Sequence, residues 1–113
     1  MHELSIACTI FDAVLEEMKQ RNLASIKKVG IRVGALTNVD PESLKFGFET
    51  IINDTPLAGS ELEIENVPIK ARCRACGNSF EAEELIFICP VCESRDNEVL
   101  QGQELDIVYL VGE

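Results

Sequence analysis

Four of the five cysteines stand in two closely spaced pairs, and this spacing is typical of a metal site. Cys73 and Cys76 form one CxxC, and Cys89 and Cys92 form another after a gap of 12 residues. Thiolates on two tight turns can converge on one tetrahedral ion, as in structural zinc sites. Iron in a rubredoxin-like site and redox dithiols are the competing interpretations. Because four protein ligands leave no open position, we expect the ion to hold structure and not to catalyse a reaction.

The single histidine, His2, offers a different chemistry at the start of the chain. Its Nδ1 and its amide nitrogen can close a chelate ring on a metal, and the amides of His2 and Glu3 can close a second ring. These donors can lie in one plane, which suits Ni(II) or Cu(II) better than zinc. The α-amine of Met1 is a further donor nearby. Taken alone this signal is weak, because residues close to a terminus are commonly tolerant of change.

The secondary-structure elements that must position the N-terminal donors and the cysteines start with an amphipathic helix near the beginning of the chain. Its apolar residues recur at spacings of three and four, which predicts one stripe packed on a core. On that stripe we expect Cys8 to act as a small core residue. A second helix is predicted after Asp40, which has the side chain of a helix N-cap and is followed by Pro41. The residues of the first stripe are Leu4, Ala7, Cys8, Phe11, Val14, Leu15 and Met18.

Alternating apolar residues predict three strands, around residues 29–33, 61–65 and 105–111. The strand–helix–strand order implies a three-stranded sheet with two helices on one face, an α+β fold. The second face of the last strand carries Val108 and Leu110, so we expect a partner to cover part of it.

The segment between the second and third strands has few regularly spaced aliphatic residues, and we expect metal to hold it together. We interpret it as an inserted zinc-ribbon lobe, with a two-stranded ribbon through Phe80 and Phe87. We therefore expect two domains, an α/β domain of residues 1–68 with 101–113, which carries the N-terminal donors, and a zinc-binding domain of residues 69–100.

Charge, hydropathy and cysteine count exclude several classes of protein. The chain has 113 residues and a net charge of −10, which argues against binding to nucleic-acid backbone and to anionic membranes. We find no apolar run long enough to span a bilayer and no signal-peptide pattern, so we expect a cytoplasmic protein. An odd number of cysteines in such a protein favours metal ligands over a disulfide framework.

Two other classes of function compete with a protein that binds a metal at its N-terminus. A zinc ribbon could be a protein-interaction or nucleic-acid-binding module, with Lys70, Arg72, Arg74 and Arg95 as the contacts. Those four basic residues stand against six acidic ones across 69–100, which favours a solvated surface. An enzyme is not expected, because no Ser/His/Asp set, phosphate-binding glycine loop or open metal site is indicated.

The order of these features resembles the HypA/HybF family of nickel chaperones for [NiFe]-hydrogenase maturation. The resemblance runs from "MHELS" through a strand ending at Gly34, "VDPESLKFGFE", the two CxxC pairs and a strand after "QGQEL". It covers the whole chain. It implies a chaperone that delivers Ni(II), together with the GTPase HypB, to the hydrogenase large-subunit precursor, and in some organisms to urease. It leaves monomer and homodimer open.

The resemblance also assigns residues. Met1, His2 and Glu3 correspond to the nickel site, and Asp40 to an acidic residue near it. Cys73, Cys76, Cys89 and Cys92 correspond to the zinc ligands. One departure is that many family members have a histidine directly after the second CxxC, where this chain has Glu93. Roles of such a histidine in zinc ligation or nickel donation therefore do not carry over.

Overall fold

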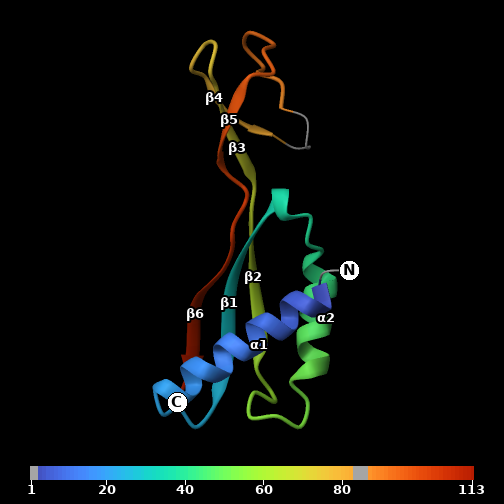
Figure 1. Ribbon diagram of the computed structural model, residues 1–113, viewed down its shortest axis with the longest axis vertical. Helices are drawn as coiled ribbons and strands as arrows, with labels where there is room; N and C mark the ends of the chain where they lie inside the picture. Colours follow the sequence, from blue (N-terminus) through green and yellow to red (C-terminus); the bar gives the residue numbers. More distant parts are fainter. Residues whose placement is uncertain (1–2, 83–86) are drawn as a thin grey trace. The chain divides into compact units, whose positions relative to one another are not determined.

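The computed structural model describes residues 3–82 and 87–113, with two helices and two three-stranded sheets (Figure 1). Contacts divide the chain into two compact units, which we call the α/β unit and the cysteine unit. The α/β unit comprises Met1–Arg32, Val39–Glu65 and Asp106–Glu113, and the cysteine unit comprises Val33–Asn38 and Asn66–Leu105. The domain division expected from the sequence stays a prediction, since compactness does not test whether either part folds alone.

The α/β unit is built on the sheet with strand order β2-β1-β6. Both helices lie on one side of this sheet and pack against each other (Figure 1). The α+β fold predicted from the sequence is confirmed. The elements are α1 (Glu3–Gln20), β1 (Ile26–Gly34), α2 (Pro41–Ile51), β2 (Glu61–Val67) and β6 (Leu105–Gly112).

The core of this unit lies between the helices and the sheet. Phe48 and Leu44 of α2 are fully buried, as are Val14 of α1 and Val29 of β1. The expected apolar stripe of α1 is partly wrong. Its buried residues are Ala7, Ile10, Val14 and Met18, so the buried face is rotated from the predicted one. In consequence Cys8, expected in the core, is exposed, and Leu4 is 56% exposed.

Helix α2 begins as the sequence predicts. Asp40 is its N-cap and accepts a hydrogen bond from the amide of Glu42 at 3.1 Å. Its other carboxylate oxygen accepts from the Ser43 hydroxyl at 2.8 Å. Pro41 fills the first helical position, where a missing N–H costs nothing. No helix in the described parts of the chain is both long and apolar enough to cross a membrane.

The cysteine unit contains a second sheet with strand order β4-β3-β5. Both neighbours run antiparallel to β3, with Phe80 opposite Ala71 and Asn97 opposite Cys73. The predicted two-stranded ribbon through Phe80 and Phe87 is therefore wrong, because Phe80 pairs with β3 and Phe87 lies outside any strand. The strands are β3 (Ile69–Cys73), β4 (Ser79–Ala82) and β5 (Asn97–Gln101).

Segment 33–38 belongs to the cysteine unit because its backbone crosses residues 102–105 closely. The amide of Gly34 donates to the Glu104 carbonyl, and that of Leu36 donates to the Gly102 carbonyl. A Cβ on Gly34 would fall 2.1 Å from that Gly102 oxygen, so this crossing requires glycine. The 3-10 helix η1 (Ala35–Thr37) follows directly.

Candidate metal centre

The four cysteines of the two CxxC pairs come together at one end of the second sheet. Their sulfurs all lie within 4.8 Å of one another. The Cys73 and Cys92 sulfurs are 3.5 Å apart, and those of Cys76 and Cys89 are 3.6 Å apart. A tetrahedral ion with zinc–sulfur bonds of about 2.3 Å requires sulfurs roughly 3.8 Å apart. The cluster therefore fits a structural zinc site.

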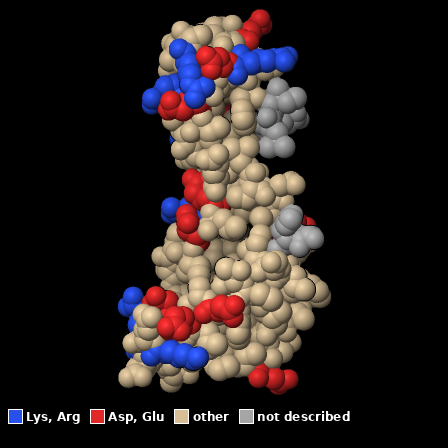
Figure 2. Space-filling model, viewed as in Figure 1, with Lys and Arg blue, Asp and Glu red and all other residues tan. Residues whose placement is uncertain are grey.

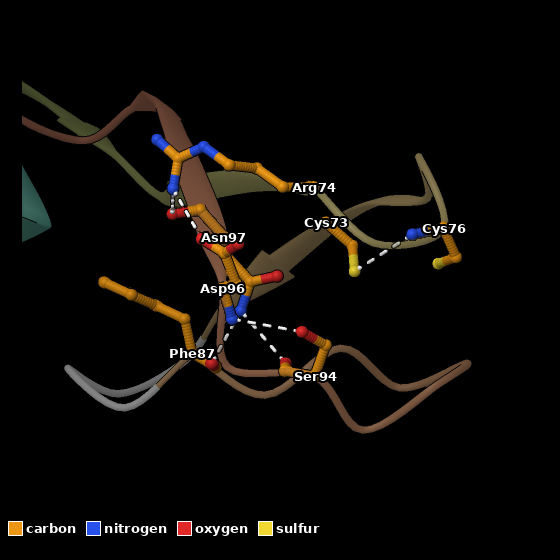
Figure 3. Close-up of polar contacts among 7 residues, drawn as sticks. All are labelled: Cys73, Arg74, Cys76, Phe87, Ser94, Asp96 and Asn97. Atoms are coloured by element: carbon orange, nitrogen blue, oxygen red, sulfur yellow. Dashed lines mark hydrogen bonds and ion pairs between the residues drawn. The ribbon is translucent and has the colours of Figure 1, made fainter.

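Each pair of cysteines sits on a turn of the same design. In the first turn the Cys76 amide approaches the Cys73 sulfur at 3.4 Å (Figure 3). The Gly77 amide donates to the Cys73 carbonyl. In the second turn the Val91 amide approaches the Cys89 sulfur at 3.4 Å, and the Glu93 amide donates to the Cys89 carbonyl. Cys73 and Cys89, the first residue of each pair, are buried, while the second is exposed.

The two turns differ at one equivalent position. Gly77 has φ +80°, which glycine adopts without strain. Glu93 has φ +64°, in the left-handed region that disfavours residues with a Cβ. The residue after the second CxxC, Glu93, thus has a strained backbone conformation that glycine would adopt freely. The sequence carried no sign of this strain.

Backbone amides set the acidity of the buried thiols. The amide of Cys76 donates to the Cys73 sulfur and lowers the pKa of that thiol. The amides of Cys92 and Val91 donate to the Cys89 sulfur and lower its pKa to about 6. Both buried sulfurs therefore favour the thiolate form, the form that binds a metal.

The exposed thiols behave in the opposite way. The Ser94 amide lowers the pKa of Cys92, but the neighbouring Cys73 thiol and burial outweigh it and raise that pKa to about 12. The pKa of Cys76 is raised as well. The Asn78 amide lowers it, but burial and the Cys89 thiol together raise it by more. In the absence of metal, Cys76 and Cys92 are therefore expected to keep their protons at a pH where Cys89 has lost its own.

Polar contacts outside the thiols tie the two turns together. Arg74 Nη1 lies 2.9 Å from an Asp96 carboxylate oxygen and donates to the Asn97 carbonyl at 3.1 Å (Figure 3). Asn97 Nδ2 donates to the carbonyls of Phe87 and Ser94, which flank the second CxxC. The sequence analysis missed the supporting roles of Arg74, Asp96 and Asn97. Arg74 is more than 20 positions from its two partners, so no local pattern in the sequence indicates these contacts.

The basic residues of this unit are accompanied by acidic ones. Figure 2 shows Lys and Arg side chains interleaved with Asp and Glu on the cysteine unit. Arg74, one of the candidate phosphate contacts, is paired with Asp96. A nucleic-acid surface needs clustered cationic groups that are available to phosphate, so this arrangement does not favour one.

The expected nickel residues are only partly within the described chain. Met1 and His2 lie outside the described residues. Glu3 is the first residue of α1, and its Oε2 accepts a hydrogen bond from the Asp40 amide at 3.2 Å. The structure thus brings together the start of α1 and the N-cap of α2, from residues 37 positions apart.

Comparison with known proteins identifies the family. A family profile described as "Hydrogenase/urease nickel incorporation, metallochaperone, hypA" matches residues 1–111. The chain belongs to the HypA family. A hydrogenase maturation factor HypA from Desulfosudis oleivorans is 44% identical over 114 residues, covering 97% of this chain and 96% of that protein. Another from Desulfitobacterium hafniense is 36% identical over 105 residues, covering 93% and 92%.

Solved HypA structures share the fold. A solution structure described as HypA protein has a TM-score of 0.72, 23% identity, and covers 100% of this chain and 97% of its own. The solution structure of the Ni metallochaperone HypA from Helicobacter pylori has a TM-score of 0.67, 23% identity, and covers 99% and 97%. The HypA family assignment made from sequence motifs is confirmed by the family profile and by the two relatives.

Proposed function

We propose that this protein binds Ni(II) at its N-terminus and helps to insert it into the [NiFe]-hydrogenase large subunit. The observation that carries the proposal is the hydrogen bond between the Asp40 amide and the Glu3 carboxylate. It brings two acidic residues together at the beginning of α1, next in sequence to His2. Carboxylates there add negative charge to a place where a helix N-terminus would otherwise repel a cation.

The proposed ligands are the amide and Nδ1 of His2, the amide of Glu3 and the α-amine of Met1. An α-helix leaves its first four amides without acceptors inside the helix, so helix formation does not compete for the Glu3 nitrogen. Nitrogen donors in one plane favour Ni(II) over zinc. Asp40 would act beside the metal, through charge and through its amide contact with Glu3.

The zinc cluster has a separate role in this proposal. Cys73, Cys76, Cys89 and Cys92 would hold zinc permanently and shape the cysteine unit, while nickel is cargo. A shallow terminal site can exchange its metal without opening a core, which suits a carrier and not a catalyst. We infer that the protein acts in the cytoplasm with a HypB-type GTPase and the large-subunit precursor, and that service to urease maturation depends on the organism.

Three proteins test the nickel site: the unaltered chain, His2→Ala, and a form with residues fused ahead of Met1. Nickel and zinc are measured on each by equilibrium dialysis and elemental analysis. We expect both alterations to weaken nickel affinity by more than about tenfold, while the zinc content stays at about one ion per chain. Equal nickel uptake by all three would contradict the site.

Variants of Asp40 separate its two roles. Asp40→Ser keeps a side chain that caps a helix but removes the negative charge. We expect Asp40→Ser to retain stability and to bind nickel more weakly, whereas Asp40→Ala should also lose about 1 kcal/mol of unfolding free energy. Unchanged nickel affinity in Asp40→Ser would show that Asp40 acts only as a helix cap and that its charge does not affect nickel binding.

A further inference from the structure

The two cysteine turns are built alike, but the chain on either side of them is not. The first turn closes a hairpin, because β3 and β4 flank it and Arg72 pairs with Ser79 across it. The second turn has no such ladder among the described residues, since residues 87–96 contain no strand and β5 begins only at Asn97. Contacts other than strand pairing must therefore hold the two ends of the second turn together.

The side chain of Asn97 joins those two ends. Its Nδ2 donates to the Phe87 carbonyl at 2.7 Å, ahead of the second CxxC, and to the Ser94 carbonyl at 3.3 Å, after it (Figure 3). The Ser94 carbonyl also accepts a hydrogen bond from the amide of Cys89 at 3.0 Å. One side chain thus provides for the second turn the closure that a pair of strands provides for the first.

These contacts fix the orientation of the Asn97 carboxamide. Nδ2 has two hydrogens and two carbonyl acceptors, whereas a flipped amide would put Oδ1 against the same two oxygens with no proton between them. Oδ1 is itself buried and has no hydrogen-bond partner within residues 3–82 and 87–113. A buried acceptor without a partner disfavours folding, so the two donated bonds must outweigh that cost. The role of this side chain is therefore donation.

Asn97 is also fixed against the first turn. In the pairing of β3 with β5 it lies opposite Cys73, the first residue of the other cysteine pair. Its carbonyl accepts from Arg74 Nη1 at 3.1 Å, and the Arg74 amide donates to the Asp96 carbonyl at 2.9 Å. Asn97 therefore contacts the first turn through its backbone and the second through its side chain, so the placing of one thiol pair against the other depends on it.

We propose that Asn97 is a positioning residue of the zinc site, which holds the second thiol pair where a tetrahedral ion needs it and so sets how long zinc stays bound. It acts on Cys89 and Cys92 through the carbonyls at the two ends of their turn. Zinc leaves such a site as its thiolates detach one after another, and a turn that stays closed returns a detached thiolate to the ion. The proposal rests on the zinc role given to these cysteines in the proposed function, and it is independent of nickel at the N-terminus.

Asn97→Ala removes both donated bonds, and Gln101→Ala is its matched control. Gln101 lies on the same strand, and its Nε2 also donates to a carbonyl, that of Pro68 at 3.0 Å, which belongs to neither cysteine turn. The transfer of zinc from loaded protein to an excess of a chromogenic chelator is timed. We expect the half-life to fall by about tenfold in Asn97→Ala and to change by less than about twofold in Gln101→Ala.

Asn97→Asp tests whether donation is the property that matters. It keeps the size of the side chain, but a carboxylate has no hydrogen to donate and would face the carbonyl oxygens of Phe87 and Ser94. We expect this variant to lose zinc at least as fast as Asn97→Ala does.

Amide hydrogen exchange on the zinc-loaded proteins gives a local measure of the same effect. Asn97→Ala should speed exchange at the amides of Cys89 and Glu93, which donate within the second turn. The matching amides of the first turn, those of Cys73 and Gly77, should exchange as they do in the unaltered protein.

Four results would overturn the proposal while leaving the zinc site intact. They are an unchanged zinc half-life in Asn97→Ala, equal effects of Asn97→Ala and Gln101→Ala, full retention of zinc by Asn97→Asp, and equal acceleration of exchange in both turns. An unaltered protein that takes up no zinc at its cysteines would instead overturn the proposal together with the zinc role.

Discussion

The ring of Tyr109 lies directly on the backbone of Gly30. A Cβ placed on Gly30 would fall 2.1 Å from ring carbon Cε2, so only glycine leaves room for this contact. The Tyr109 hydroxyl then donates a hydrogen bond to Glu63. Because the strand order is β2-β1-β6, one side chain thus links the two outer strands across the central one.

Gly30→Val is expected to displace the Tyr109 ring and to lower the free energy of unfolding by about 1–3 kcal/mol. Urea denaturation measures this loss. In a Tyr109→Ala background the same substitution should be neutral or stabilising, because valine is better suited than glycine to a strand. Equal losses in both backgrounds would show that the ring contact is not the cause.

The acidity of Tyr109 reports on the same contact. The hydrogen bond to Glu63 raises the pKa of Tyr109 above its ordinary value of 10.0, and it lowers the pKa of Glu63 below 4.5. The Tyr109 contribution to stability is therefore present below pH 10.0 and is lost as pH rises through its folded pKa. The Glu63 contribution is present above pH 4.5 and is lost as pH falls through its folded pKa.

Absorbance at the phenolate band gives the Tyr109 pKa without interference, since the chain has one tyrosine and no tryptophan. Glu63→Ala should bring this pKa back toward 10.0. Glu61→Ala removes the same charge from the same strand without removing the hydrogen bond, and it should change the pKa much less. A larger effect of Glu61→Ala would contradict the assigned contact.

Zinc binding should release fewer than four protons per ion near pH 7, because the pKa of Cys89 is lowered to about 6 and this thiol has already lost its proton, while the raised pKa values of Cys76 and Cys92 keep theirs in place. Calorimetry of the zinc-free protein in buffers of different ionisation enthalpy measures this number. Below a pH of about 6, Cys89 also becomes protonated, so proton release should rise and zinc affinity should fall. Release of about four protons at pH 7 would contradict the assigned acidities.

Glu93→Gly is expected to stabilise the zinc-loaded protein by about 1 kcal/mol, because φ +64° strains a residue with a Cβ. Urea denaturation at fixed zinc concentration measures the gain. Glu98→Gly is the matched control. Glu98 lies within β5, where glycine should cost about 0.5–1 kcal/mol. Loss of stability in both variants would argue that the Glu93 side chain has a contact that outweighs the strain.

Local patterns in the sequence were sufficient for the main features of the fold. Asp40 before Pro41 predicted the start of α2, and alternation around Val29 predicted β1. The CxxC spacing predicted two thiol pairs on tight turns, and metal chemistry predicted that the two pairs converge. The helix start, the strand and each thiol pair depend on a few neighbouring residues, so the chain encodes them locally.

Other features depended on tertiary contacts. Helix α1 has apolar residues on more than one face, so periodicity could not decide that Ile10 is buried while Cys8 is exposed. The short strands of the cysteine unit alternate too few residues to reveal that Phe80 pairs with Ala71. The contact between Glu3 and Asp40 joins two helix starts far apart in the chain, and only the resemblance to a family suggested that Asp40 lies near the start of α1.

The most direct test of this account is nickel X-ray absorption on protein loaded with about one zinc and then about one Ni(II) per chain. The account predicts a planar nickel site of nitrogen donors with no sulfur, which disappears in His2→Ala while the zinc edge still reports four sulfurs. Nickel coordinated by sulfur, with His2→Ala leaving its spectrum unchanged, would contradict it.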